Sequence, residues 1–99
     1  MKQNNIILKA IHSSGLLSKS QKSILQYIVS FDLNRGVTAS AIMNHMQITK
    51  QAVNFSLKEL IKRNFVIRSK DRVFIYKVNQ NKLEEILEDY SIHTGLKQD

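Results

Sequence analysis

The stretch that decides the fold runs from Thr38 to Lys77 and reads TASAIMNHMQITKQAVNFSLKELIKRNFVIRSKDRVFIYK. Apolar residues recur at helical spacing from Ala41 to Met46 and again from Lys50 to Arg63, on either side of the short segment Gln47-Ile48-Thr49. β-Branched and aromatic residues, which favour strands, follow the second of these segments. The stretch therefore predicts a short helix, a tight turn, a longer basic helix and a basic β-hairpin.

The β-hairpin is predicted from two runs of strand-forming residues, Phe65 to Ser69 and Val73 to Val78. The runs are joined at Lys70-Asp71 or a residue to either side, so the tip of the hairpin is short. We expect Val37 to add a short strand to this hairpin. Three cations cluster at the tip: Arg68, Lys70 and Arg72.

Further helices are predicted on both sides of this stretch. Their apolar stripes are Ile7, Leu8 and Ile11 in a helix over about residues 4–14, then Ile24, Tyr27, Ile28 and Phe31, and finally Leu83, Ile86, Leu87 and Tyr90 in a helix over about residues 81–93. We expect Thr38 to cap the short helix and Asn81 to cap the last one, with Glu84 three residues on as in a capping box. The residues after Thr94 are expected to fray.

Length and composition limit the class of protein. The 99 residues suffice for one domain, spanning residues 1–99 with a core of residues 17–78. The chain has no cysteine, so neither a disulfide framework nor a thiolate metal site is expected. No apolar run approaches the roughly 20 residues of a membrane span, and the polar residues 1–5 make a poor signal peptide. A cytoplasmic protein without a membrane partner is the expectation.

The net charge of +7 is unevenly distributed along the chain. Residues 50–78 carry eight Lys/Arg and two acids, whereas residues 79–99 carry two Lys and five acids. The densest positive charge therefore coincides with the longer helix and the hairpin. Two helices joined by a short turn, the second carrying cations, fit the major groove of double-stranded DNA. A basic hairpin beside them is suited to the phosphate backbone.

Four segments resemble the motifs of a known family. Leu17-Ser18-Lys19-Ser20-Gln21 is similar to a Leu-Thr-x-x-Gln entry into a helix, and residues 46–54 match a Leu-Gly-Leu-Ser-x-x-Thr-Val-Ser pattern. Asn64-Phe65-Val66 stands in place of Gly-Leu-Val, and Asp71-Arg72 matches an Asp-Arg pair. From about Leu17 to Val78 the chain thus resembles winged helix-turn-helix regulators, most closely the MarR type, with a layout close to the ArsR type. The resemblance implies a DNA-binding fold and a homodimer.

The chain departs from that family pattern at several places. Gln47 and Asn64 stand where glycines are usual, and both positions can accept these residues, Asn more easily than Gln. The wing is shorter, and one helix follows it where MarR-type proteins have two. The family's ligand pocket is therefore not carried over to this chain, and no effector or other cofactor is predicted.

The outward face of the longer helix holds the candidate base-reading residues. On a helix that starts near Lys50, positions 53, 57, 60 and 61 face the core. The remaining outer positions are Gln51, Asn54, Phe55 and Lys58. The two amides can bond adenine and the phenyl ring can contact a thymine methyl, so an A·T-rich site is expected. Packing of Phe55 under the wing is the alternative for that side chain.

A second set of residues is better suited to phosphates. These are Thr49 and Lys50 at the start of the longer helix, and Arg68, Lys70 and Arg72 on the hairpin, where Arg can also enter a narrow minor groove. Lys62 and Arg63 lie at the other end of the helix and are left out of the predicted site. For the outer face of the longer helix, a solvated polar face is the alternative to a binding role.

We therefore expect an α+β fold, mainly α with a small β-hairpin: a winged helix-turn-helix with flanking N- and C-terminal helices. The expected function is sequence-specific binding of double-stranded DNA by a nucleoid-associated homodimer that regulates, and most simply represses, transcription. The flanking helices would form the dimer, placing half-sites roughly 34 Å apart. Plasmid or phage replication control would use the same surface.

A different class of function is a protein-interaction module. It would dock through an exposed face of the second strand, either Val73 and Ile75 or Phe74 and Tyr76. No catalytic constellation is visible, so an enzyme is not expected. Asp89 and His93 have the i, i+4 spacing of two metal ligands, but a satisfied or exposed histidine is the simpler interpretation and no metal site is predicted.

Overall fold

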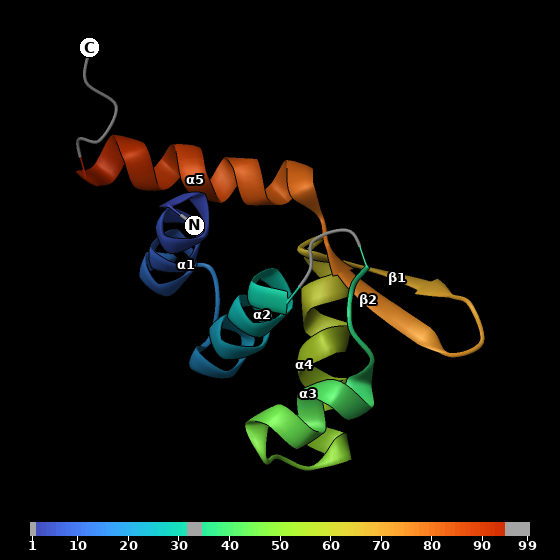
Figure 1. Cartoon of the computed structure of the whole chain (residues 1–99). Helices are drawn as coiled ribbons and strands as arrows, with labels where there is room; N and C mark the ends of the chain where they lie inside the picture. Colours follow the sequence, from blue (N-terminus) through green and yellow to red (C-terminus); the bar gives the residue numbers. More distant parts are fainter. Residues whose placement is uncertain (1, 32–34, 95–99) are drawn as a thin grey trace.

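The computed structural model describes residues 2–31 and 35–94, shown in Figure 1. In chain order the elements are α1 (Lys2–Ser13), α2 (Lys19–Phe31), α3 (Ala39–Met46), α4 (Lys50–Lys62), β1 (Val66–Lys70), β2 (Phe74–Val78) and α5 (Gln80–Thr94). The two strands form an antiparallel hairpin beside α4, and α5 lies across α1 at the other end of the molecule (Figure 1). This arrangement confirms the predicted α+β fold, a winged helix-turn-helix with a flanking helix at each end.

The start of α2 is fixed by a reciprocal pair of hydrogen bonds. The Gln21 backbone N–H donates to Ser18 Oγ and the Ser18 backbone N–H donates to Gln21 Oε1, each over 3.2 Å. This capping box satisfies two N–H groups that the helix itself leaves free. The apolar stripe that follows differs from the predicted one at its end, because Phe31 is 61% exposed whereas Leu25 and Val29 are buried. The prediction that Phe31 belongs to the core is wrong.

Two threonines begin the two helices of the helix-turn-helix. Thr38 Oγ1 accepts from the Ala41 N–H and Thr49 Oγ1 accepts from the Ala52 N–H, each over 3.1 Å. Between the helices, Gln47 adopts the left-handed conformation, with φ 58°. The predicted cap at Thr38 is confirmed, and the chain turns from α3 into α4 without a glycine.

The end of α4 is also close to its predicted place. The helix stops at Lys62, one residue before the predicted end at Arg63, and Asn64 takes the left-handed conformation with φ 67°. The Phe65 N–H then donates to the Leu60 carbonyl over 2.9 Å, which satisfies a carbonyl at the helix end. Phe65 is buried, so this turn directs the chain from α4 into the core before β1 begins.

The register of the hairpin decides which side chains face α4. Val66 pairs with Val78, Arg68 with Tyr76 and Lys70 with Phe74, so these six residues share one face of the sheet. Tyr76 and Val78 are buried on that face. Ile75 and Lys77 lie on the other face, across from Ser69 and Ile67. Of the two pairs considered for a docking surface, Phe74 and Tyr76 therefore lie on the side of α4, Ile75 lies half-buried on the opposite face, and Val73 lies in the loop before β2.

A third segment pairs with the hairpin. The Val37 N–H donates to the Tyr76 carbonyl over 2.9 Å, and the Tyr76 N–H donates to the Val37 carbonyl over 2.8 Å. The short strand expected at Val37 is thus present as a single bridge. It fixes the start of α3 beside β2.

The start of α5 differs from the prediction. Asn79, not Asn81, caps the helix, since Asn79 Oδ1 accepts from the Asn81 N–H over 3.2 Å and Asn81 lies inside α5. The predicted Asn81–Glu84 capping box is therefore wrong. Asn79 also donates from Nδ2 to the Asn64 carbonyl (2.9 Å) and from its N–H to the Phe65 carbonyl (2.8 Å). These long-range bonds hold Asn79 in the capping position, and a local sequence pattern does not reveal them.

The apolar stripe of α5 packs within the same chain. Leu83 and Ile86 are buried in the core together with Ala10 and Ile11 of α1, while Leu87 and Tyr90 pack at its edge. The core is thus continuous from the flanking helices to the hairpin. Residues after Thr94, expected to fray, lie outside the described residues. None of the helices in residues 2–31 and 35–94 combines the length and the apolar composition that a bilayer crossing requires.

Gly36 provides a test of the bridge between Val37 and β2. Its φ is +78°, and a Cβ placed there would lie 2.7 Å from the Tyr76 carbonyl oxygen and 2.8 Å from Ile75 Cγ2. Gly36→Ala should therefore lower the free energy of unfolding by about 2–3 kcal/mol, from left-handed strain plus displacement of β2. Urea denaturation followed by circular dichroism measures this change.

The matched control is Gly15→Ala, because a Cβ at Gly15 meets nothing within 4 Å. Its free energy of unfolding should stay within about 0.5 kcal/mol of the parent. Equal stability of the two variants would show that Gly36 is not required for the approach to β2.

Candidate nucleic-acid interface

The helix α4 divides into a buried face and an exposed face. Val53, Leu57 and Leu60 are at most 2% exposed, as predicted, whereas Ile61 is only half-buried. Ser56 joins the buried face, which the apolar pattern did not indicate. The predicted outer residues Gln51, Asn54, Phe55 and Lys58 are all exposed. This face of the helix is therefore free to meet a partner.

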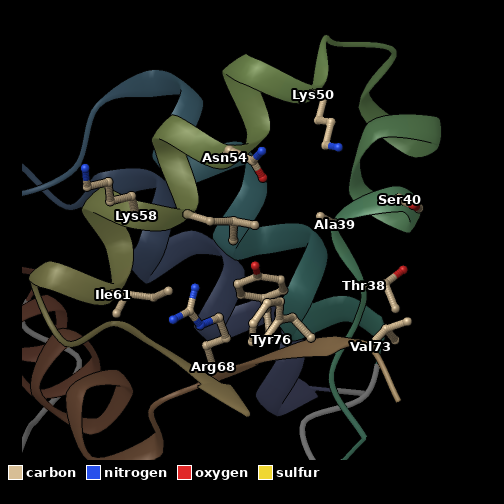
Figure 2. A pocket seen from close by; sticks show the side chains of 12 residues that line it. Thr38, Ala39, Ser40, Lys50, Asn54, Lys58, Ile61, Arg68, Val73 and Tyr76 are labelled. Atoms are coloured by element: carbon tan, nitrogen blue, oxygen red, sulfur yellow. The ribbon is translucent and has the colours of Figure 1, made fainter. Parts of the chain in front are cut away.

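A groove of about 880 Å³ lies between α4, the hairpin and the start of α3. We call it the α4–wing groove; its lining residues are Thr38, Ala39, Ser40, Lys50, Asn54, Leu57, Lys58, Ile61, Arg68, Val73, Phe74 and Tyr76. Figure 2 shows Lys50, Asn54 and Lys58 extending from α4, with Arg68 and Tyr76 on the hairpin side. Residues distant in the sequence thus form one concave surface.

The charge of the α4–wing groove has one sign. Three of its lining side chains are cations, Lys50 and Lys58 from α4 and Arg68 from β1, and none of its twelve lining residues is acidic. Cations that converge in a concave surface raise the local positive potential and attract polyanions. The groove is thus suited to phosphate groups.

An aromatic ring holds two wing cations in place. The guanidinium carbon of Arg68 lies 4.5 Å from the centre of the Phe74 ring, and Lys70 Nζ lies 5.4 Å from it. These are cation–π contacts, which the hairpin register allows because all three side chains share a face. Arg72 lies in the exposed loop between the strands and is not among the groove residues. Of the three predicted wing cations, Arg68 and Lys70 therefore lie on the face of the hairpin that includes Phe74, and Arg72 lies at the tip.

Thr49 has a structural task already. Its Oγ1 accepts the Ala52 N–H as the cap of α4, but its hydroxyl hydrogen remains available to donate to an anion. Lys50 is the first residue of α4 and lines the groove beside it. Both residues are thus at the helix start where a phosphate would be favoured.

Eight of the twelve lining residues were not in the predicted site, and three of these carry hydroxyl groups: Thr38, Ser40 and Tyr76. The hydroxyl-bearing side chains of Thr38 and Ser40 reach the groove because the bridge between Val37 and Tyr76 brings the start of α3 beside the hairpin. The sequence predicted that Val37 pairs with the hairpin, and this pairing could have indicated that Thr38 and Ser40 lie beside the groove. The alternative packing of Phe55 under the wing is wrong, since Phe55 is 64% exposed and is absent from the groove lining.

The histidines do not form a metal site in the described part of the chain. His45 stacks on Tyr27, with ring centres 4.3 Å apart, and His12 is exposed. The side chain of His93, the partner considered for Asp89, lies outside the described residues. Among residues whose side chains are described, no group of three or more His, Cys, Asp or Glu is placed to hold a metal ion.

Comparison with solved structures shows that this fold recurs. The crystal structure of a viral Zalpha domain bound to left-handed Z-DNA matches with a TM-score of 0.56 and 23% identity, over 62% of this chain and 87% of that chain. The ST1889 protein of the thermoacidophilic archaeon Sulfolobus tokodaii matches with a TM-score of 0.61 and 18% identity, over 96% and 93% of the two chains. A possible transcriptional regulator from Methanosarcina mazei Go1 matches with a TM-score of 0.59 and 18% identity, over 98% and 86%.

At these identities the similarities establish a shared winged-helix fold. The Sulfolobus and Methanosarcina structures align with nearly the whole chain, so the similarity extends beyond the helix-turn-helix and the hairpin. A scan against models of protein families and a search of curated protein sequences found no match to the chain.

The turn between α3 and α4 supports a stability prediction. Gln47 has φ 58°, a conformation that costs a residue with a Cβ about 1–2 kcal/mol. Gln47→Gly removes this strain but increases the conformational entropy of the unfolded chain. Because the relief of strain is the larger effect, the free energy of unfolding should rise by about 0.5–1 kcal/mol. Urea denaturation measures the change.

Asn64→Gly is the control, because Asn64 also has positive φ (67°) but asparagine tolerates it better than glutamine. The free energy of unfolding should rise less in Asn64→Gly than in Gln47→Gly. A loss of stability in Gln47→Gly would mean that the side chain, which donates to the Asn44 carbonyl over 2.8 Å, outweighs the strain.

Proposed function

We propose that this protein binds double-stranded DNA sequence-specifically and regulates transcription, most simply as a repressor. In this proposal α4 enters a major groove, and the hairpin lies on the adjacent backbone. The observation that carries it is the α4–wing groove, where Lys50, Lys58 and Arg68 converge from two elements beside the exposed face of α4. The protein would act by binding rather than catalysis and would associate with the nucleoid.

The exposed residues divide into two kinds of contact. Gln51 and Asn54 carry amides that can each form two hydrogen bonds with adenine, and Lys58 can donate to guanine. Thr49, Lys50 and the wing cations are placed for phosphates, which fix the position of the protein without reading sequence. The resemblance to MarR-type and ArsR-type regulators supports this division, because their recognition helix and wing correspond to α4 and the hairpin.

Charge also favours one orientation on DNA. Four exposed acids lie on α5, namely Glu84, Glu85, Glu88 and Asp89, and Figure 1 places this helix away from the hairpin tip. A polyanion attracts the cationic end of the molecule and repels the acidic one. The protein would therefore approach DNA with α4 and the wing first.

We further propose a homodimer formed through α1 and α5. Two apolar residues remain exposed on these helices, Ile6 at 42% and Ile92 at 63%, and Leu87 and Tyr90 are only half-buried. A two-fold dimer matches a pseudo-palindromic site with half-sites roughly one helical turn apart.

The dimer is tested by sedimentation velocity. We expect the parent chain to form a dimer at high protein concentration and Ile6→Glu/Ile92→Glu to remain a monomer, because two buried charges per protomer oppose association. Val73→Glu, at an exposed apolar position on the hairpin loop, is the control and should remain dimeric. A parent chain that is monomeric throughout would remove the dimer and leave DNA binding to be judged by itself.

Left-handed DNA is a second candidate ligand. It is favoured by one observation, the match of 62% of this chain to a Zalpha domain whose crystal structure contains Z-DNA. Binding to a left-handed duplex depends on the shape of the backbone, whereas the amides on α4 favour base reading in a right-handed major groove. Competition between right-handed and left-handed duplexes separates the two.

The proposed function is tested by fluorescence anisotropy with labelled random-sequence duplex DNA across a salt series. For each phosphate that the protein neutralises, a tenfold rise in salt concentration should lower the logarithm of the affinity by about 0.9. The variant Gln51→Ala/Asn54→Ala/Lys58→Ala should bind more weakly and with a salt slope reduced by about one, since it loses one cation.

The matched control is Lys19→Ala/Gln80→Ala/Asn81→Ala, which removes the same residue types from exposed positions on α2 and α5. It should bind like the parent. No binding at low salt by the folded protein would reject the DNA proposal. The exposed apolar residues of the hairpin, among them Ile67 at 52% and Val73 at 55% exposure, would then make a protein partner the leading interpretation.

A further inference from the structure

Phe55 is an aromatic side chain placed where a DNA-reading helix is most exposed. It lies on α4 and is 64% exposed. Gln51 precedes it by four residues and Lys58 follows it by three, so the three side chains form one stripe along the helix. This stripe is opposite the buried residues Val53 and Leu60. The ring is therefore part of the surface that would face the floor of a major groove.

The Phe55 ring is not part of the packing that stabilises the fold. It is outside the core cluster, in contrast to Phe65, and it does not line the α4–wing groove, in contrast to Phe74. Phe74 holds the wing cations through its ring face, whereas Phe55 extends from α4 toward solvent. A large apolar group in this place points to an apolar group on the ligand.

The major-groove edge of a base pair offers one apolar group, the C5-methyl of thymine. The neighbours of Phe55 fit the partner base, because Gln51 and Asn54 present amides that suit adenine. We propose that Phe55 recognises the 5-methyl group of a pyrimidine, and so makes binding dependent on that methyl. The proposal rests on the proposed function, since it requires α4 in a major groove.

The same chemistry extends beyond thymine. In 5-methylcytosine the methyl group occupies the same place on the groove edge, whereas uracil lacks it. Phe55 would therefore distinguish thymine from uracil and methylated from unmethylated cytosine at the contacted position. Burying one methyl group corresponds to about a fourfold change in affinity.

The test compares duplexes of two helical turns built from alternating dA and dT or from alternating dA and dU, with affinity measured by anisotropy at fixed salt. The parent protein should bind the dT duplex about fourfold more tightly for each methyl contacted. Phe55→Ala should bind the two duplexes equally. Phe31→Ala removes an equally exposed ring, 61% exposed, from α2 and should keep the preference of the parent.

Comparing both proteins on both duplexes separates the methyl contact from any change in the DNA itself, since a stiffer or softer duplex affects the parent and the variant alike. Random-sequence duplexes made with 5-methylcytosine instead of cytosine give a second readout, in which the parent gains affinity and Phe55→Ala does not. Circular dichroism and thermal melting check that Phe55→Ala is folded.

Two outcomes overturn the proposal while leaving DNA binding intact. Equal binding of the parent to dT and dU duplexes would exclude a methyl contact. A preference for dT that persists in Phe55→Ala would assign it to another residue or to duplex shape. Absence of salt-sensitive binding to any duplex would instead reject the proposed function itself.

Discussion

The geometry of the candidate interface depends on the pairing of Val37 with Tyr76. Two backbone hydrogen bonds of 2.9 and 2.8 Å join a residue before α3 to the middle of β2. Because α3 leads directly into α4, this pairing fixes the hairpin relative to the helix that would read DNA. Gly36 allows the close approach, since only a residue without a Cβ fits against the β2 backbone there. Together with the turn at Asn64 that joins α4 to β1, the bridge sets the separation between the cations of α4 and those of the wing.

The buried face of α4 leaves its exposed face unconstrained by folding. Val53, Leu57 and Leu60 are almost fully buried and hold the helix against α2 and β1. Burial of each such side chain is worth about 1.5–3 kcal/mol, so the helix is positioned without any contribution from Gln51 or Phe55. The residues on the exposed face of α4 are therefore available for contacts with a ligand. This separation explains why exposed substitutions on α4 are suitable tests of binding, because their effect on stability should be small.

Local signals in the sequence were sufficient for most of the fold. Thr38 as a helix cap and Asn64 as a left-handed residue follow from side-chain chemistry within a few positions, and both are as predicted. The failures arise from long-range contacts. Asn79 caps α5 because it is bound to the end of α4, fifteen residues earlier, whereas the local pattern favoured Asn81. The groove is lined by residues from Thr38 to Tyr76, so the patterns of the helix and the hairpin identified its cations but not its shape.

The packing of α5 also limits what a dimer interface can contain. The sequence offered four apolar residues for a partner, but the chain buries Leu83 and Ile86 itself, against α1. The exposed apolar residues that remain on these two helices, Ile6 and Ile92, give only a small area for association. Interfaces well below about 1,000 Å² are weak or transient. A dimer of this kind would gain from DNA itself, because a site with two half-sites holds two protomers at high effective concentration. Formation of the proposed dimer would then be coupled to DNA binding. A DNA site with two symmetric half-sites would favour the dimer over the separate protomers.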